Sequence, residues 1–202
     1  MRWRRYGEHA ALLDCDSPDQ LTAARATLAA ASLADITDLV PGARTLLVVA
    51  VPGSGGLEAA REVVESADLA HPPADTSREV VLDVHYDGED LAMVAADAAL
   101  SVDEVVTLHT SAVYIVAFTG FAPGFGYLTG LPAPLHQPRL PSPRTRVPAG
   151  SVAIAGEYTG VYPRESPGGW RLIGHTSATL FDPAATPPAL FAPGDRVRFR
   201  SV

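Results

Sequence analysis

The spacing of apolar residues changes near residue 86, and this change divides the chain into two parts with different expected architectures. Up to about residue 85, apolar stretches alternate between strand-like and helical spacing. From 86 onward, short apolar stretches are separated by many Gly and Pro residues. Strands and helices bury side chains with periods of about 2 and 3.6 residues, so the two patterns predict different folds. A chain of 202 residues has room for two domains, and we expect them at 1–85 and 86–202.

The first part has the element order of a small α+β domain. Ser17, Pro18 and Gln20 supply an N-cap, a proline in the first turn and a capping-box side chain, which predicts a helix over 18–32. A second helix is predicted over 57–69. Strands are predicted at 10–14, 36–40, 45–51 and 79–85. The order β-α-β-β-α-β is typical of a ferredoxin-like unit, with two helices on one face of an antiparallel sheet.

The second part is predicted to be a β-barrel domain with two short helices. One amphipathic helix falls within 87–100, and a second begins after Ser101, where Ser101 and Glu104 form a capping box. Apolar strands are predicted at 112–118, 152–155, 171–173 and 197–199. Short strands separated by turn residues are typical of barrel-like β domains.

The charged residues exclude some kinds of chemistry. The net charge is −8, and all 15 basic residues are arginines. Without lysine, the chain cannot supply the lysine of a phosphate-binding loop, a Schiff base or a biotin attachment site. An acidic chain also lacks the cationic surface that nucleic-acid backbones require, so we expect no nucleic-acid partner.

The remaining composition indicates a cytoplasmic protein. Cys15 is the only cysteine, so no intrachain disulfide can form, which fits a reducing compartment. The arginine-rich start is followed by no apolar stretch of the kind found in signal peptides, and no apolar stretch is long enough to cross a membrane. The six histidines are scattered without metal-ligand spacing, so we expect no metal site.

Residues 131–150 contain six prolines and three arginines, Arg139, Arg144 and Arg146. Each proline fixes φ and removes a hydrogen-bond donor, so regular structure is not expected there. A rigid loop that presents guanidinium groups suits recognition of a carboxylate or phosphate. A solvated loop whose arginines pair with acidic neighbours explains the composition equally well.

Polar side chains and a lone tryptophan converge just after this loop. They are Ser151, Glu157, Tyr162, Ser166, Trp170 and His175. A histidine between Gly174 and Thr176 suits general acid–base chemistry near neutral pH. A single histidine of this kind is also common as a structural or surface residue.

Three long motifs in this region resemble one known family. They read GFAPGFGYLTGLP from residue 120, PRLPSPRTRVPAGSVAIAG from 138 and TGVYPRESPGGWRLIGHT from 159. Together they resemble the family of the 5-oxoprolinase B subunit, whose members are also called PxpB, KipI and allophanate hydrolase subunit 1, or carboxyltransferase domain subdomains C and D. Weaker agreement extends to GEHAAL near the start, so the resemblance spans most of the chain.

The resemblance implies a small α+β domain followed by a cyclophilin-like β-barrel. It also implies a complex with the 5-oxoprolinase C subunit, itself a related barrel protein, and a third, lactam-hydrolase subunit. That complex hydrolyses 5-oxoproline to glutamate at the expense of ATP. We therefore expect ATP to be shared with partner subunits and held here by arginines and main-chain amides, in a protein that is inactive alone.

The resemblance leads to a hypothesis for individual residues. Arg139, Arg144 and Arg146 would form an anion clamp, with Glu157 and Trp170 as further contacts. Ser151, Tyr162 and Ser166 would orient the amide substrate, and His175 would transfer a proton. Family members commonly have Gln where this chain has Tyr158, and often Arg where it has His175.

Two other functions share the same motifs. A KipI-like binding protein would inhibit the autophosphorylation of a histidine kinase, with exposed aromatic residues as anchors. Phe121, Phe125, Tyr127 and Trp170 are the candidates for those anchors. An allophanate hydrolase or urea carboxylase component would act on urea instead of 5-oxoproline.

Overall fold

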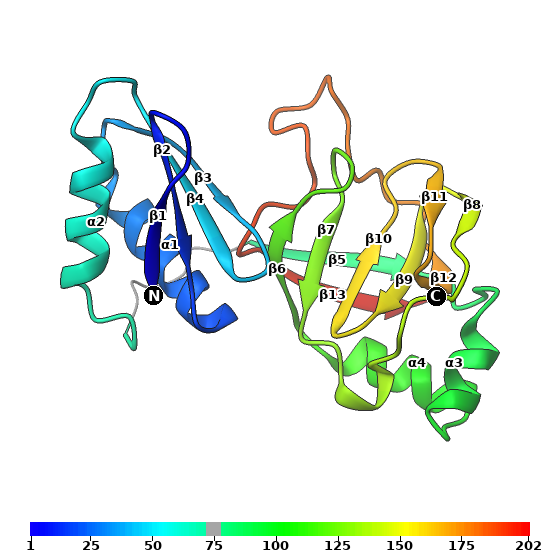
Figure 1. Ribbon diagram of the computed structural model, residues 1–202. Coiled ribbons are helices and arrows are strands. Elements are labelled where there is room, and N and C mark those ends of the chain that lie inside the picture. The colour runs from blue at the N-terminus through cyan, green and yellow to red at the C-terminus, as the bar shows by residue number, and fades with distance from the viewer. Residues whose placement is uncertain (72–77) are drawn as a thin grey trace. The chain divides into compact units, whose positions relative to one another are not determined.

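The computed structural model describes residues 1–71 and 78–202, and its chain divides into two compact units, 1–76 and 77–202. Each unit has its own sheet and its own hydrophobic core (Figure 1). Strand β5 (Glu79–Val84) pairs with the last strand of the chain and so belongs to the second unit. The first unit therefore ends before the strand that the sequence placed at its end.

The first unit is a four-stranded antiparallel sheet with two helices. The strand order is β1-β2-β4-β3, from β1 (Arg2–Arg5), β2 (Ala10–Asp14), β3 (Ile36–Pro41) and β4 (Thr45–Ala50). Helix α1 (Pro18–Ala31) follows β2, and helix α2 (Gly56–Ser66) follows β4. The predicted ferredoxin-like order is not confirmed, because the position beside β2 is filled by β1 and not by the strand at 79–84.

Local chemistry places both ends of α1. The Ser17 hydroxyl accepts a hydrogen bond from the Gln20 main chain, and Ser32 ends the helix in a left-handed conformation with φ of 47°. Leu21, Ala24 and Leu28 pack in one core with Leu13 and Leu46 of the sheet. Cys15 is buried in this core as a free thiol, and burial raises its pKa. Cys15 therefore acts as a core side chain of the first unit.

The second unit is a mixed seven-stranded sheet that curves into a nearly closed barrel. Its strand order is β12-β9-β10-β7-β6-β13-β5, and only the β13–β5 pair is parallel. Besides β5, the strands are β6 (Tyr114–Thr119), β7 (Gly126–Thr129), β9 (Ser151–Ala155), β10 (Tyr158–Val161), β12 (Arg171–His175) and β13 (Arg196–Ser201). The prediction of a barrel-like β domain in this part of the chain is confirmed.

A two-residue bridge joins the free edges of the barrel. The main-chain N–H of His85 donates to the carbonyl of His175, and the N–H of His175 donates to the carbonyl of His85, both at 2.9 Å. A Cβ atom at residue 174 would lie 2.4 Å from the His85 carbonyl oxygen. Gly174 is therefore required for the two edges to approach each other.

The barrel core contains one completely buried histidine. Helices α3 (Leu91–Asp97) and α4 (Val102–Ser111) lie at one end of the barrel and contribute Leu91, Val94 and Val105 to the core (Figure 1). His109 of α4 contacts the Tyr86 hydroxyl through Nδ1 at 2.7 Å and the Thr159 hydroxyl through Nε2 at 3.0 Å. Burial lowers the pKa of His109 from 6.5 to about 3, so the imidazole is neutral.

A second cluster lies on the opposite face of the same strands. Along β9, Val152 and Ile154 belong to the barrel core, whereas Ala153 and Ala155 belong to this outer cluster. A two-stranded ribbon, β8 (Arg144–Val147) and β11 (Ser166–Gly168), contributes Val147 to it. The proline-rich segment thus contains a strand and a 3₁₀ turn (Ala133–Leu135), although no regular structure was expected there.

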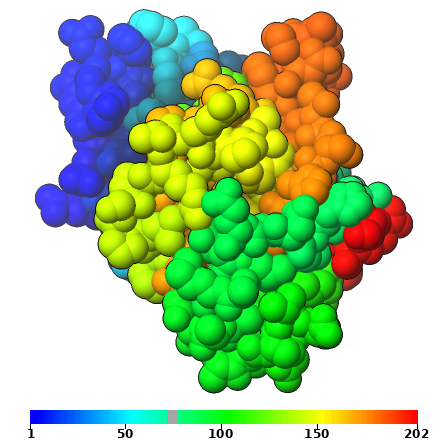
Figure 2. Space-filling model, turned by 90° about the vertical axis from the view of Figure 1, so that its right-hand side faces the viewer, coloured from blue at the N-terminus to red at the C-terminus, as the bar shows by residue number. Residues whose placement is uncertain are grey.

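The segment that follows β5 runs along the β12 edge. Asp87, Asp90 and Asp97 of this segment each bind a residue on β8 or β12. Figure 2 shows this segment, in green, beside the yellow-green ribbon segment that contains Arg144. No helix within 1–71 or 78–202 is both long and apolar enough to span a membrane.

Candidate functional site

The predicted site residues all lie in the second unit, but the structure separates them into three places. Tyr162, Trp170 and the arginines gather around the outer cluster and its ribbon. Ser151 and His175 are opposite each other on β9 and β12. Glu157 lies in the turn between β9 and β10.

Tyr162 is at the centre of the outer cluster. Its ring makes edge-to-face contacts with Phe125, at a centroid distance of 5.6 Å, and with the exposed Phe121 at 6.0 Å. A Cβ atom at residue 168 would lie 2.3 Å from the phenol oxygen, so only glycine fits beside it. Burial raises the pKa of Tyr162, while a hydrogen bond from the Trp170 main chain and the nearby charges of Arg139 and Arg144 oppose the shift. The phenol is therefore a neutral hydrogen-bonding group.

The three predicted clamp arginines have different partners. Arg144 donates to Asp90 at 2.6 Å and to Glu89 at 3.4 Å, and its buried Nη1 has no hydrogen-bond partner among residues 1–71 and 78–202. Arg146 forms an exposed pair with Glu165 at 2.7 Å. Arg139 is exposed and makes no ion pair within the described part of the chain. Only Arg139 therefore has its whole guanidinium available to an anion, and Arg144 contributes at most one nitrogen.

Trp170 and Ser166 have mainly structural contacts. Trp170 is buried and packs edge-to-face against Phe125 and Tyr127, at centroid distances of 5.5 and 5.6 Å. The Ser166 hydroxyl donates to the Arg164 carbonyl at 3.4 Å on the ribbon. Both residues shape the surroundings of Tyr162.

His175 has the geometry of an oriented acid–base residue. Its Nδ1 contacts an Asp87 oxygen at 2.8 Å, and its side chain is 50% exposed. The ring of His85 lies beside it at a centroid distance of 5.1 Å. A carboxylate that holds Nδ1 leaves Nε2 for proton transfer at the surface.

Three of the predicted residues are neighbours along adjacent segments of the barrel. His175 is the register partner of Ser151, and the Tyr162 N–H donates to the Ser151 carbonyl at 3.0 Å. The Ser151 hydroxyl is buried and donates to the Pro148 carbonyl at 2.8 Å. Ser151 therefore stabilises the turn before β9, and the structure shows no contact between its hydroxyl and His175.

Glu157 and Tyr158 are at the opposite end of β9 and β10 from Ser151. Burial raises the pKa of Tyr158 to about 12, and the neighbouring Glu157 carboxylate adds to this shift. Tyr158 also contacts Phe118 and Tyr127 edge-to-face at 5.8 Å each. The residue that departs from the family motif is therefore part of an aromatic surface.

Sequence reasoning missed the acidic residues that hold this site together. Asp87 orients His175, and Asp90 binds both Arg144 and the Leu172 main chain. No motif marks them, since their partners are more than 50 positions away in the sequence. Among residues 1–71 and 78–202, no group of three or more His, Cys, Asp or Glu side chains could hold a metal ion.

Comparison with known proteins places this geometry in a family. Residues 1–191 match the family described as carboxyltransferase domain, subdomain C and D. The chain belongs to this family. It is 43% identical over 201 residues to the 5-oxoprolinase B subunit of Escherichia coli O157:H7, which covers 96% of this chain and 92% of that protein. The resemblance drawn from the three motifs is confirmed.

Solved structures agree with this membership. The crystal structure of TTHA0988 is 34% identical with a TM-score of 0.81, and the match covers 96% of this chain but only 40% of that one. This chain thus spans two fifths of the length of that solved chain. The urea amidolyase of K. lactis shares the fold at 19% identity and a TM-score of 0.69, over 99% of this chain and 15% of that one.

Proposed function

We propose that this chain is the B subunit of an ATP-dependent 5-oxoprolinase, which hydrolyses 5-oxo-L-proline to L-glutamate. The observation that carries this proposal is the 43% identity to the E. coli 5-oxoprolinase B subunit over nearly the whole of both chains. In the reaction, water adds to the lactam carbonyl and the C–N bond breaks, which leaves an amino group and a new carboxylate. The hydrolysis of ATP to ADP and phosphate drives this step.

The proposal includes partner subunits, because this chain offers too few groups for the whole reaction. It has no lysine, and two of the three expected clamp arginines are occupied by carboxylates. We assign the missing groups to the 5-oxoprolinase C subunit and to a third, lactam-hydrolase subunit, with ATP shared among them. On this proposal the isolated chain is inactive. The complex would work in the cytoplasm, where the buried Cys15 thiol stays reduced.

Arg139 is the proposed anion-binding residue of this protein. It carries a guanidinium without an ion pair in the described chain, and its charge acts on the Tyr162 phenol. The buried Nη1 of Arg144 is a second donor without a partner among the described residues. A carboxylate or phosphate oxygen would satisfy both groups, because guanidinium donors suit planar oxyanions. The carboxylate of 5-oxoproline and the phosphates of ATP both have this chemistry.

His175 is the proposed proton-transfer residue. The Asp87 contact fixes the ring through Nδ1, and the half-exposed side chain leaves Nε2 accessible to a substrate. A histidine held in this way can take a proton from water or give one to the leaving nitrogen. The buried Ser151 hydroxyl takes no part in this proposal, because the Pro148 carbonyl already occupies it.

ATP hydrolysis stimulated by 5-oxoproline tests the function. It is measured with the purified chain alone and then with the complex that copurifies from the native source. We expect stimulation only with the complex. A stable complex that ignores 5-oxoproline but responds to urea would overturn the substrate. A chain that forms no complex and binds a kinase dimerisation domain would overturn the enzyme proposal.

A further inference from the structure

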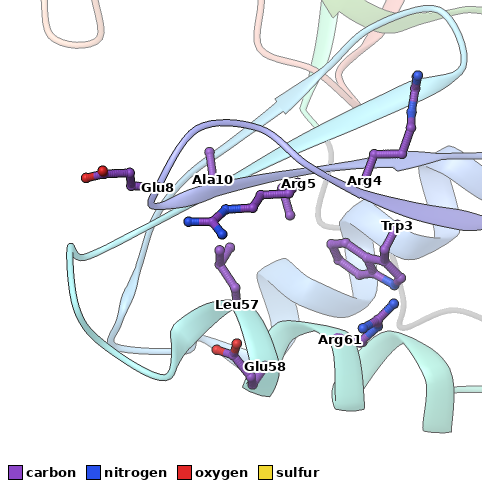
Figure 3. A pocket seen from close by; sticks show the side chains of 9 residues that line it. Trp3, Arg4, Arg5, Glu8, Ala10, Leu57, Glu58 and Arg61 are labelled. Atoms are coloured by element: carbon purple, nitrogen blue, oxygen red, sulfur yellow. The ribbon is translucent and has the colours of Figure 1, made fainter.

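The first unit contains a pocket that the proposed function does not use. It has a volume of about 420 Å³ and lies between the β1–β2 hairpin and helix α2 (Figure 3). Pockets for small molecules have volumes of roughly 300–1,000 Å³. Trp3 and Leu57 line it, and both also pack against the core of the first unit. The pocket therefore has an apolar wall that packs against the core of the first unit.

Two guanidinium groups and one carboxylate point into this space. Figure 3 shows Arg5 of β1 above Leu57, Glu58 of α2 below Leu57, and Arg61 of α2 below the Trp3 ring. Arg4 and Glu8 also line the opening, but their charged ends point outward in the same view. Alternation along β1 explains the difference between Arg4 and Arg5, because successive side chains of a strand face opposite sides.

Both inward arginines are held at one nitrogen and have donors to spare. Arg5 donates from Nε to the Gly7 carbonyl at 2.9 Å, and Arg61 donates from Nε to Glu65 at 3.0 Å. Their terminal nitrogens have no hydrogen-bond partner within 1–71 and 78–202, and Glu58 makes no ion pair there. The Arg61–Glu65 contact is also an ion pair, but it uses Nε alone, whereas Asp14 holds Arg4 at two nitrogens, both at 2.8 Å. Arg5 and Arg61 therefore each keep unpaired terminal nitrogens at the pocket, beside a Glu58 carboxylate that has no ion pair among the described residues.

We infer that this pocket binds an acidic amino acid. Two guanidinium groups match two carboxylates, and the Glu58 carboxylate matches one ammonium group. Trp3 and Leu57 provide apolar contact for the methylene groups between these charges. A ligand that carries only anionic groups would bind more weakly, because the Glu58 carboxylate would repel those groups or remain unpaired.

L-Glutamate has this pattern of charges, and it is also the product of the proposed reaction. Binding in the first unit would then let the protein sense the accumulation of product through residues other than those assigned to catalysis. This link to product sensing rests on the proposed function, whereas the binding itself does not. The two can therefore fail separately.

Calorimetric titration of the purified chain with L-glutamate tests the inference. We expect saturable binding that weakens about tenfold or more in Arg5→Ala and in Glu58→Gln, which corresponds to the loss of one charged contact. Arg4→Ala and Glu8→Gln are the matched controls, because they change the same residue types at the rim. Both controls are expected to bind as the natural chain does.

A ligand series separates an amino-acid site from a general anion site. Glutarate lacks the ammonium group, and 5-oxoproline lacks both the ammonium and the second carboxylate, so we expect both to bind more weakly than L-glutamate. No binding of L-glutamate at millimolar concentration would overturn the inference. Equal binding of glutarate, stronger binding of ATP, or an equal effect of Arg4→Ala and Arg5→Ala would overturn it as well. A chain that fails this test but supports 5-oxoproline turnover in the complex would leave the proposed function intact.

Discussion

The Asp90 carboxylate accepts a hydrogen bond from Arg144 at 2.6 Å, between residues that are 54 positions apart in the sequence. Its second oxygen accepts the Leu172 main-chain N–H at 2.7 Å. Asp90 is only 5% exposed, so both contacts are shielded from water. One side chain thus connects the segment after β5 to the ribbon and to β12.

Removal of Asp90 is expected to destabilise the second unit strongly. Asp90→Ala leaves the Leu172 N–H without its acceptor and leaves Arg144 with only the exposed Glu89 at 3.4 Å. Breaking a buried pair costs about 3–5 kcal/mol. Urea denaturation measures the change in the free energy of unfolding. Glu165→Ala is the control, since it breaks the exposed Arg146–Glu165 pair and such pairs contribute about 1 kcal/mol or less. Equal losses in the two variants would contradict the role of Asp90.

His109 is expected to make stability fall in mild acid. In the folded state its pKa lies at about 3, whereas an unfolded chain takes up the proton near the ordinary value of 6.5. Neutral His109 therefore makes its full contribution to the free energy of unfolding above pH 6.5, and this contribution is lost as the pH falls from 6.5 toward 3. Between about pH 7 and about pH 4.5, the protein should therefore take up protons when it unfolds.

His109→Gln provides the comparison, because glutamine does not titrate in this range. Asp16 and Asp68, whose pKa values are lowered by partners, also reduce stability in acid, so the natural chain and the variant must be compared over the same pH interval. We expect a smaller pH dependence in the variant. An unchanged slope would show that His109 is not the titrating group.

Arg139→Ala is expected to weaken substrate binding without a change in stability. Its guanidinium makes no ion pair in the described chain, so folding loses no charged contact, whereas an anion in the site would lose a bidentate partner. The reconstituted complex should show KM raised by about tenfold or more for 5-oxoproline or ATP. Arg164→Ala, at another arginine of the same unit, should leave KM unchanged. A normal KM in Arg139→Ala would exclude the assignment.

His175→Gln is expected to lower kcat more than it raises KM. Glutamine cannot exchange a proton, although it can keep a hydrogen bond to Asp87, and general acid–base catalysis contributes about 10²–10⁴-fold. The matched control is His71→Gln, because His71 also contacts an aspartate through Nδ1 at 2.8 Å and is exposed. The assignment fails if both variants turn over normally.

Local sequence signals predicted the elements well, and long-range pairing explains what they missed. The capping box at Ser101 and Glu104 is present as predicted, because both partners lie within four residues. The strand at 79–84 was also predicted, but its partner was not. Its alternating apolar residues could pack against the core of the first unit or that of the second. Only its pairing with β13, more than 100 residues later in the sequence, places it in the second unit.

The candidate site shows the same division. Positions such as Tyr162 and His175 could be selected by residue type, and the structure brings both to one end of β9 and its neighbours. Which of the selected side chains are free to bind a ligand could not be predicted, because this depends on hydrogen-bond and ion-pair partners elsewhere in the chain. Asp90 occupies Arg144, Glu165 occupies Arg146 and Pro148 occupies Ser151.

Each unit carries one of the two tryptophans, Trp3 against the first core and Trp170 in the outer cluster of the second. Indole fluorescence responds to polarity, so a chain with Trp170→Phe reports on the first unit alone, and one with Trp3→Phe reports on the second. Coincident transitions would mean that the two units unfold as one cooperative system, and separate transitions would mean that each has its own stability. The protein thus contains an internal probe of whether an event in one unit is transmitted to the other.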